Sequence, residues 1–250
     1  MTFGRKYIDL SHSLDAGTVI YPGDPDYYMV AHASHIKDGY SVHKLSLGTH
    51  TGTHIDAPYH FFADEDTVEK IFIGDLIGPV VVIDLSGLNS QGGLLLEEGK
   101  DIQPLNERER ITWDYLQPYE HFLLPGRILL INTGWSKLHY KTPKYRDHPY
   151  LAPDVASELL TRGIRVVGVD TLNPDETPSS SDAPESADGF GFHEKFLGGG
   201  GLIAENVTNL EELIEAQKAT PGTTWIVNLV PLKLVGGDGS PVRAFAYNLE

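Results

Sequence analysis

The sequence contains no cysteine, only 19 basic residues against 35 acidic ones, and no long apolar run. The lack of cysteine excludes disulfides, thiolate-bound zinc and a thiol nucleophile, so any metal must be bound by nitrogen and oxygen ligands. The formal net charge of -16 argues against nucleic acid or a membrane surface as a partner, because both repel an acidic protein.

The first ten residues lack the apolar core of a signal peptide, and the apolar stretches near residues 80–83 and 128–131 are too short to cross a bilayer. We therefore expect a cytoplasmic protein.

The length of 250 residues, with 40% hydrophobic and 22% charged residues, fits one large globular domain or two small ones. No internal repeat is visible, and we expect a single domain over residues 1–250. Helix signals are few. One helix is predicted over residues 153–162, with Pro153 at its first position and Gly163 just past its end, and another near Thr208, where Thr208 and Glu211 fit a capping box. Short apolar runs rich in Val, Ile and aromatic residues predict strands over residues 7–10, 79–84, 128–132, 164–170, 202–204, 225–230 and 242–247.

This pattern predicts a mixed α/β domain with a large β component. No Gly-x-Gly-x-x-Gly motif leads from a strand into a helix, which argues against a doubly wound nucleotide fold. Residues 135–150 and 174–191 read as two long loops. Loops of this length usually have a function or are disordered, and the tyrosines of the first fit an oligomer contact equally well.

A dense cluster of histidines carries the chemical signal. His50, His54, Asp56 and His60 lie within eleven residues of a chain that has 11 histidines in total, and their even numbering places them on one face of an extended strand. A straight strand would hold the Cα atoms of His50 and His54 about 13 Å apart, too far for two imidazoles that each need a zinc–nitrogen distance of about 2.0–2.1 Å. We therefore predict a strand that bends at Gly52 and leads into a turn, with the side chains converging.

Neutral imidazole and carboxylate groups suit a borderline divalent cation. In a catalytic site the cation keeps a position open for water and lowers the pKa of that water from about 15.7 to about 7. A further group must then move the proton from water to the leaving group, and His60 is placed for this role. No Gly-x-Ser-x-Gly motif is present, which argues against a serine nucleophile.

Residues 50–60 resemble the pattern His-x-Gly-Thr-His-x-Asp-x-Pro-x-His of the metal-dependent cyclase family, which includes bacterial kynurenine formamidases and isatin hydrolases. His193, followed twelve residues later by Glu205, resembles the second metal segment of that family. The segment from Tyr21 to Asp24 (Tyr-Pro-Gly-Asp) resembles its beginning. The similarity extends over nearly the whole chain.

The resemblance implies a swivelling β/β/α domain with mixed β-sheet content and few helices, assembled as a homodimer or homotetramer. It implies that His50, His54 and Asp56 hold a first metal ion. Asp56 and Glu205 would bridge to a second ion, and His193 would complete that position. Zinc is the favoured ion and manganese the alternative, with one or two ions in each chain.

The resemblance also makes His60 the proton donor and acceptor, and Tyr21 a substrate contact. The expected function is hydrolysis of a small amide, lactam or ester, and Tyr21, Trp135 and the tyrosines of residues 135–150 favour an aromatic substrate. Two other functions fit the same residues: a metal-assisted cyclase or dehydratase of a biosynthetic pathway, and a non-catalytic metal-binding protein. Relative to the formamidases, we expect insertions around residues 91–119 and 175–191.

Overall fold

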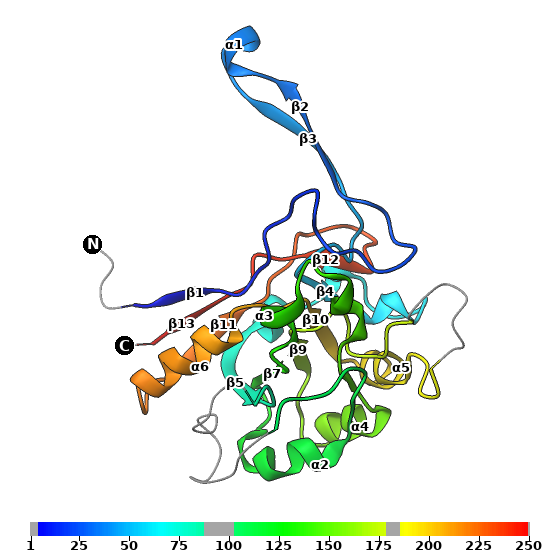
Figure 1. The fold of residues 1–250 in the computed structure, drawn as a ribbon, viewed down its shortest axis with the longest axis vertical. Coiled ribbons are helices and arrows are strands. Elements are labelled where there is room, and N and C mark those ends of the chain that lie inside the picture. The colour runs from blue at the N-terminus through cyan, green and yellow to red at the C-terminus, as the bar shows by residue number, and fades with distance from the viewer. Residues whose placement is uncertain (1–4, 88–102, 179–185, 250) are drawn as a thin grey trace.

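The computed structural model describes residues 5–87, 103–178 and 186–249, and its main feature is a strongly curled sheet of nine strands (Figure 1). The strand order is β1-β13-β11-β5-β7-β9-β10-β4-β12. The four central strands, β5, β7, β9 and β10, run parallel, and antiparallel strands flank them on both sides. The mixed sheet confirms the predicted fold class.

The described residues form mostly short strands and few helices. The strands are β1 (Tyr7–Asp9), β2 (Tyr28–Ala33), β3 (Val42–Ser46), β4 (His54–Asp56), β5 (Ile77–Asp84), β6 (Arg110–Ile111), β7 (Ile128–Asn132), β8 (Tyr150–Leu151), β9 (Val166–Val169), β10 (Leu202–Glu205), β11 (Trp225–Asn228), β12 (Gly239–Pro241) and β13 (Phe245–Asn248). The α-helices are α1 (His35–Asp38), α2 (Trp113–Leu116), α3 (Trp135–His139), α4 (Pro153–Thr161), α5 (Gly191–Gly198) and α6 (Leu210–Ala219).

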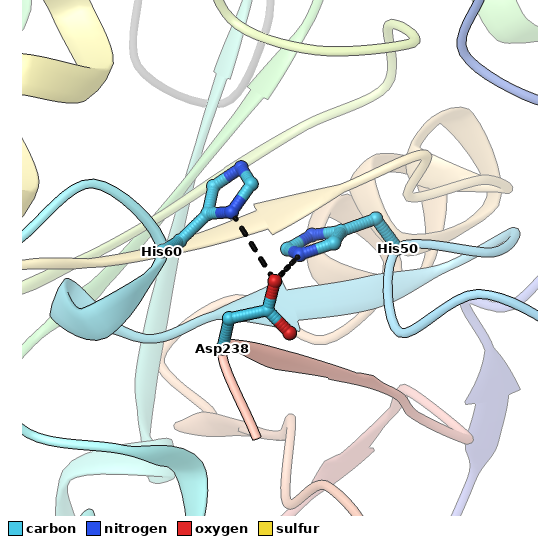
Figure 2. Close-up of side chains that lie close together, drawn as sticks. All are labelled: His50, His60 and Asp238. Carbon is cyan, nitrogen blue, oxygen red and sulfur yellow. Dashed lines mark hydrogen bonds and ion pairs between the residues drawn. The ribbon is translucent and has the colours of Figure 1, made fainter. Parts of the chain in front are cut away.

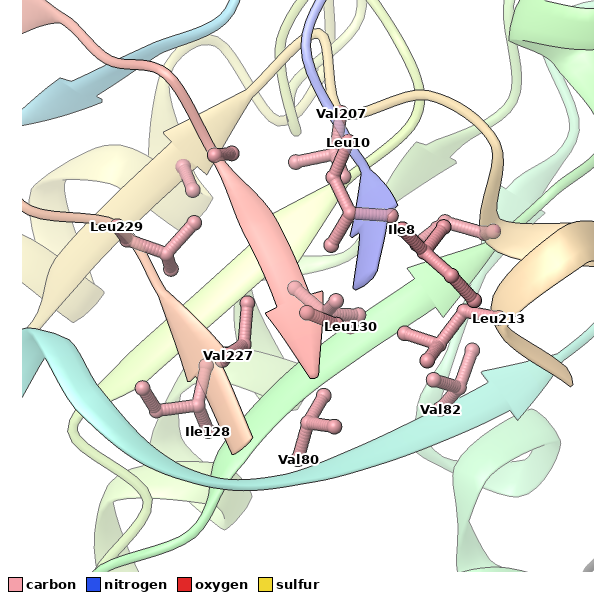
Figure 3. Close-up of a cluster of buried hydrophobic side chains, with 14 of the residues drawn as sticks. Ile8, Leu10, Val80, Val82, Ile128, Leu130, Val207, Leu213, Val227 and Leu229 are labelled. Atoms are coloured by element: carbon pink, nitrogen blue, oxygen red, sulfur yellow. The ribbon is translucent and has the colours of Figure 1, made fainter. Parts of the chain in front are cut away.

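Both faces of the central strands are buried, so alternate residues enter two different cores. Val82 of β5 packs in one core with Leu213 of α6 (Figure 3). Its neighbour Ile83 packs in the other core with Leu159 of α4. Strands buried on both faces read as continuous apolar runs, which is why residues 128–132 show no polar alternation. Each fully buried aliphatic side chain of this kind contributes about 1.5–3 kcal/mol of transfer free energy.

Most predicted elements are confirmed, with shifted ends. Helix α4 has Pro153 in its first turn, and Gly163 follows its end with a φ of +79°. The predicted strand over residues 242–247 is only partly right, because β13 begins at Phe245. The reading of residues 135–150 as one long loop is wrong, since this stretch contains α3 and a 3-10 helix, Pro143–Asp147.

The predicted capping box at the start of α6 is also wrong. The N-cap is Asn209, with a left-handed φ of +57° and no side-chain cap. Thr208 is used elsewhere, since its hydroxyl accepts a hydrogen bond from Ser136 Oγ at 3.3 Å. A tertiary contact has therefore taken the hydroxyl that a local cap would need.

A hairpin of β2 and β3 with α1 at its tip, which we call the arm (residues 28–46), projects away from the body (Figure 1). It was not predicted from the sequence. Both faces of the arm are exposed, including Tyr28, Met29 and Leu45 on its strands, and Ile36 at the tip is fully exposed. An isolated two-stranded hairpin is at best marginally stable in water, so the arm lacks the packing that normally holds such an element.

The expected insertions lie partly beyond what the structure describes, since residues 91–102 of the first and 179–185 of the second fall outside the described ranges. Within the described ranges, none of the helices combines the length and the apolar character that crossing a membrane requires.

Candidate metal centre

The histidine-rich segment bends as the sequence predicts. Gly52 has a left-handed φ of +66°, after which β4 and a 3-10 turn, Pro58–His60, follow. A Cβ atom at residue 52 would lie 2.4 Å from Cδ2 of Leu14. The bend therefore needs glycine for its φ angle, whereas the contact with Leu14 could be relieved by moving that side chain. The prediction of a kinked strand leading into a turn is confirmed.

Strand pairing brings the two motif segments together. β4 lies between β10 and β12, in a register that places His54 opposite Glu205 and Asp56 opposite Gly239. His193 is in the first turn of α5, which packs against β10. Side chains from the first and last quarters of the chain thus converge on one place because β4 inserts between two strands from the C-terminal part.

The three imidazoles surround the carboxylates of Asp56 and Glu205. His50 Nδ1 lies 2.7 Å from Asp56 Oδ1, and His54 Nε2 lies 3.2 Å from the same oxygen. His54 Nε2 is also 3.3 Å from Glu205 Oε2. His193 Nε2 lies 3.1 Å from Glu205 Oε1 and 3.6 Å from Asp56 Oδ2. All five predicted ligands therefore lie together, and only His50 is not fully buried.

The other ring nitrogen of each imidazole faces an acceptor outside this cluster. His193 Nδ1 lies 2.6 Å from Asp175 Oδ2, and His50 Nε2 lies 3.1 Å from Asp238 Oδ2. His54 Nδ1 lies 2.8 Å from the carbonyl oxygen two residues earlier. Neither aspartate was predicted from the sequence to belong to the site. No spacing marks them, because their positions depend on the path of the chain after β9 and before β12.

The cluster holds charges of both signs. Burial lowers the pKa of His50, but contacts with Asp238 and Asp56 outweigh burial and raise this pKa to about 9. Burial likewise opposes the contacts of His54 with Asp56 and Glu205, which raise its pKa to about 10. Burial disfavours the ionised form of Asp56, yet the surrounding histidines hold its pKa well below its usual range. Protons on the imidazoles therefore balance the carboxylates when no cation is bound, and a cation would release them on binding.

Two buried polar atoms in the middle of the cluster, His54 Nε2 and Asp56 Oδ2, have no hydrogen-bond partner. Such atoms are rare in folded proteins, and here they point to a missing ligand. Around them, His50, His54 and Asp56 place ligand atoms within 4.8 Å of one another, and so do Asp56, His193 and Glu205. A third, more exposed group of His50, His60 and Asp238 meets the same distance, but only the first two groups share a carboxylate. Nitrogen and oxygen donors in those two groups fit one or two divalent cations.

His60 lies beside this cluster. Its Nδ1 is 3.6 Å from Asp238 Oδ2, the oxygen that also faces His50 (Figure 2). The centroids of the His60 and His50 rings are 4.0 Å apart. Burial lowers the pKa of His60, so its imidazole is neutral at pH 7 and can accept a proton.

A cavity of about 170 Å³ opens beside the cluster. Tyr21, the predicted substrate contact, lies in its wall, and the ring of Phe61 stacks on His193 with 5.0 Å between centroids. A small pocket that combines aromatic and aliphatic walls with polar side chains is typical of a ligand site. The lining residues are Tyr21, Asp24, His50, His60, Phe61, Leu172, Asn173, Phe190, His193 and Glu205.

Two other aromatic residues that were expected to favour an aromatic substrate are part of the hydrophobic core. Trp135 and Tyr145 are buried and pack against Leu172. The Tyr145 hydroxyl donates to the main-chain oxygen of Asp170 at 3.1 Å. Trp135 and Tyr145 therefore contribute to neither the cavity nor an exposed contact surface, and the support that they gave to an aromatic substrate is removed.

Comparisons with known proteins identify the family and the fold. Residues 8–176 match the model of the Cyclase family. The kynurenine formamidase of Bacillus mycoides (strain KBAB4) is 31% identical over 243 residues, which cover 96% of each chain. The kynurenine formamidase of Bacillus anthracis is 31% identical over 241 residues, again covering 96% of each chain.

Solved structures share the fold. Isatin hydrolase A from Labrenzia aggregata, bound to benzyl benzoate, has a TM-score of 0.77 at 24% identity, over 98% of this chain and 94% of that one. A structure described as a potential metal-dependent hydrolase with cyclase activity has a TM-score of 0.67 at 25% identity, over 99% and 100% of the two chains. Because the family model matches more than half of the chain and the formamidases align along almost all of it, this chain belongs to the Cyclase family, as its histidine motif predicts.

Proposed function

We propose that this chain is a metal-dependent hydrolase that cleaves the C–N bond of a small amide or lactam, with esters as a second substrate class. The proposal rests on one observation: three imidazoles and two carboxylates converge beside a small cavity, and two of their buried atoms, His54 Nε2 and Asp56 Oδ2, form no hydrogen bond. Relatives named kynurenine formamidase and isatin hydrolase support hydrolysis over a cyclase or dehydratase reaction.

The two groups of side chains define two metal positions. His50, His54 and Asp56 would hold the first ion, and Asp56, His193 and Glu205 the second, with Asp56 and Glu205 able to reach both. A donor set without sulfur suits zinc, with manganese as the alternative. A divalent cation supplies a Lewis acid that polarises a carbonyl oxygen and lowers the pKa of water.

His60 would move the proton. It lines the cavity, and its Nδ1 faces Asp238, so Nε2 is the atom free to exchange a proton with bound molecules. In hydrolysis the oxygen of water bonds to the carbonyl carbon, the C–N bond breaks, and one proton passes from water to the leaving nitrogen. His60 takes that proton and then delivers it, which is the work of a general base followed by a general acid.

The cavity limits the size of the part of the substrate that lies beside the cluster. Protein cavities of about 150 Å³ bind benzene, so 170 Å³ suits a molecule with one aromatic ring near the bond to be cleaved. Tyr21, Phe61 and Phe190 supply flat aromatic walls for that ring.

Metal analysis of protein purified without chelators is the direct test, followed by turnover assays with N-formylkynurenine, isatin and simple lactones. We expect one or two zinc or manganese ions per chain, and hydrolysis of at least one substrate that stops on chelation and returns with the ion. Metal-free protein, or turnover that resists chelation, would refute the proposal. Intact metal with no turnover on any amide, lactam or ester would favour a non-catalytic binding protein.

We also propose that residues 1–250 form a single domain, because β1 near one end pairs with β13 near the other, and that this domain assembles as a homodimer or homotetramer. The exposed arm supports assembly, since it leaves Met29 and Leu45, which pair across its two strands, open to water. The double variant Met29→Asp, Leu45→Asp should lower the solution mass to that of one chain, measured by light scattering. Lys37→Ala at the tip is the control, and an unchanged mass in the double variant would exclude the arm from the contact.

A further inference from the structure

The outward-facing nitrogens of the ligand histidines point to two further residues of the site. His193 and His50 each direct one ring nitrogen to Asp56 or Glu205 and the other to a second carboxylate. Those second carboxylates are Asp175 and Asp238, and each contacts only one of the two histidines.

Asp175 is fully buried and firmly fixed. Its Oδ1 accepts a hydrogen bond from the backbone N–H of Phe192 at 2.8 Å, and its Oδ2 accepts one from the backbone N–H of His193 at 3.1 Å. Its own N–H donates to Asn173 Oδ1 at 2.8 Å. The 2.6 Å contact with His193 Nδ1 therefore joins the imidazole to an anchored carboxylate, which fixes the ring so that Nε2 faces the cluster.

Asp238 is anchored through its backbone. The N–H of Ala57, next to the end of β4, donates to the carbonyl oxygen of Asp238 at 2.9 Å. The following residue, Gly239, pairs with Asp56 in the sheet. The carboxylate of Asp238 thus contacts His50 Nε2 (Figure 2), while Asp56 Oδ1 contacts the other ring nitrogen, Nδ1.

We propose that Asp175 and Asp238 are positioning residues, one for each metal position, and this inference rests on the proposed metal-dependent function. A carboxylate that accepts the outer N–H of a ligand imidazole fixes the tautomer and the ring orientation and makes the inner nitrogen a better donor. Asp175 does this for His193 in the second position. Asp238 does it for His50 in the first position.

The test is the Zn²⁺ affinity of each position, measured on chelator-treated protein by competition with a chromophoric chelator. Wild-type protein should take up two ions. Asp175→Asn should weaken the binding of one ion about 10- to 100-fold, and Asp238→Asn should weaken the binding of the other by a similar factor. Asp170→Asn is the matched control, because Asp170 is equally buried and accepts hydrogen bonds from Thr133 but contacts no ligand histidine.

Histidine variants assign each effect to its position. In a His193→Ala background only the first position remains, so Asp175→Asn must leave its affinity unchanged while Asp238→Asn lowers it. In a His50→Ala background only the second position remains, so Asp175→Asn must lower its affinity while Asp238→Asn leaves it unchanged. A role in folding alone would lower the unfolding temperature and weaken both positions together.

The outcomes separate this inference from the function on which it rests. A wild-type protein that binds no Zn²⁺ overturns the proposed function. A wild-type protein that binds one ion, or aspartate variants that bind two ions as tightly as wild type, overturn the assignment and leave the function standing. Equal loss at both positions, or an equal loss in Asp170→Asn, also overturns it.

Discussion

Replacing Gly239 by alanine tests whether the close approach of β12 to β4 positions His50. Gly239 does not have a positive φ, so alanine suits the backbone and any cost must be steric. A Cβ atom there would lie 2.6 Å from His50 Cε1 and 2.9 Å from the carbonyl oxygen of Ile55. The imidazole can rotate away from the new methyl group, but the carbonyl oxygen belongs to the paired strand β4 and cannot.

Overpacking of this kind costs about 1–3 kcal/mol. At about 1.4 kcal/mol per factor of ten, this corresponds to roughly 5- to 150-fold in an equilibrium constant. We expect a loss of Zn²⁺ affinity in that range at the position that His50 serves, because His50 relieves the clash by leaving its ligand orientation. A lower unfolding temperature should accompany this loss, since the contact with Ile55 remains.

Competition with a chromophoric chelator measures the affinity, and thermal unfolding of the same samples measures stability. Gly17→Ala is the matched control, since Gly17 also lacks a positive φ and a Cβ there would meet only the exposed side chains of Asp15 and Lys141. If Gly239→Ala bound Zn²⁺ and unfolded like wild type, the packing of β12 against His50 would not be what positions this ligand.

Three further predictions follow from the site and its surroundings. His60→Ala should keep the bound metal but lose about 10²–10⁴-fold in turnover, and full turnover on a good substrate would refute its role. Free metal at a hundredfold excess over its dissociation constant should stabilise the fold by about 2.7 kcal/mol, so chelation should lower the unfolding temperature by about 5–10 °C; an unchanged temperature would contradict this. Burial lowers the pKa of His148 to about 4, below its usual value of about 6.5, so between these values only the unfolded chain binds the proton. Stability should therefore fall by up to about 3 kcal/mol as the pH drops from about 6.5 to about 4. Burial also lowers the pKa of His12 to about 4, so urea unfolding should show a smaller loss over this range in His148→Gln than in wild type, and parallel curves would contradict it.

The metal motif was predictable because its information is local. The spacing of His50, His54 and Asp56 required a bend, and Gly52 was the residue in that stretch that could provide it. The same holds for α4, whose Pro153 and Gly163 mark both ends in the sequence. Where a few adjacent residues determine the backbone, the predicted and observed structures agree.

The features that the sequence did not predict correctly depend on contacts between distant parts of the chain or on exposure to solvent. Thr208 and Glu211 have the spacing of a capping box, but Thr208 instead hydrogen-bonds to Ser136 across the fold. Asp175 reaches His193 only because α5 packs beside the segment that follows β9. A half-buried strand is predicted from alternating apolar and polar residues. The two strands of the arm are exposed on both faces and lack this alternation, so nothing in the sequence indicated them.

Charge balance across the site favours two ions over one. Four carboxylates, those of Asp56, Glu205, Asp175 and Asp238, contact three imidazoles. Three of these carboxylates are buried, and the fourth, Asp238, is partly exposed to solvent. With the imidazoles neutral, as metal ligation requires, a single divalent cation does not balance even the three buried carboxylates. Buried charge without compensation is costly, whereas two divalent cations balance the four carboxylates. The two outer aspartates, which the metal motif itself does not include, are therefore part of the reason to expect a second ion.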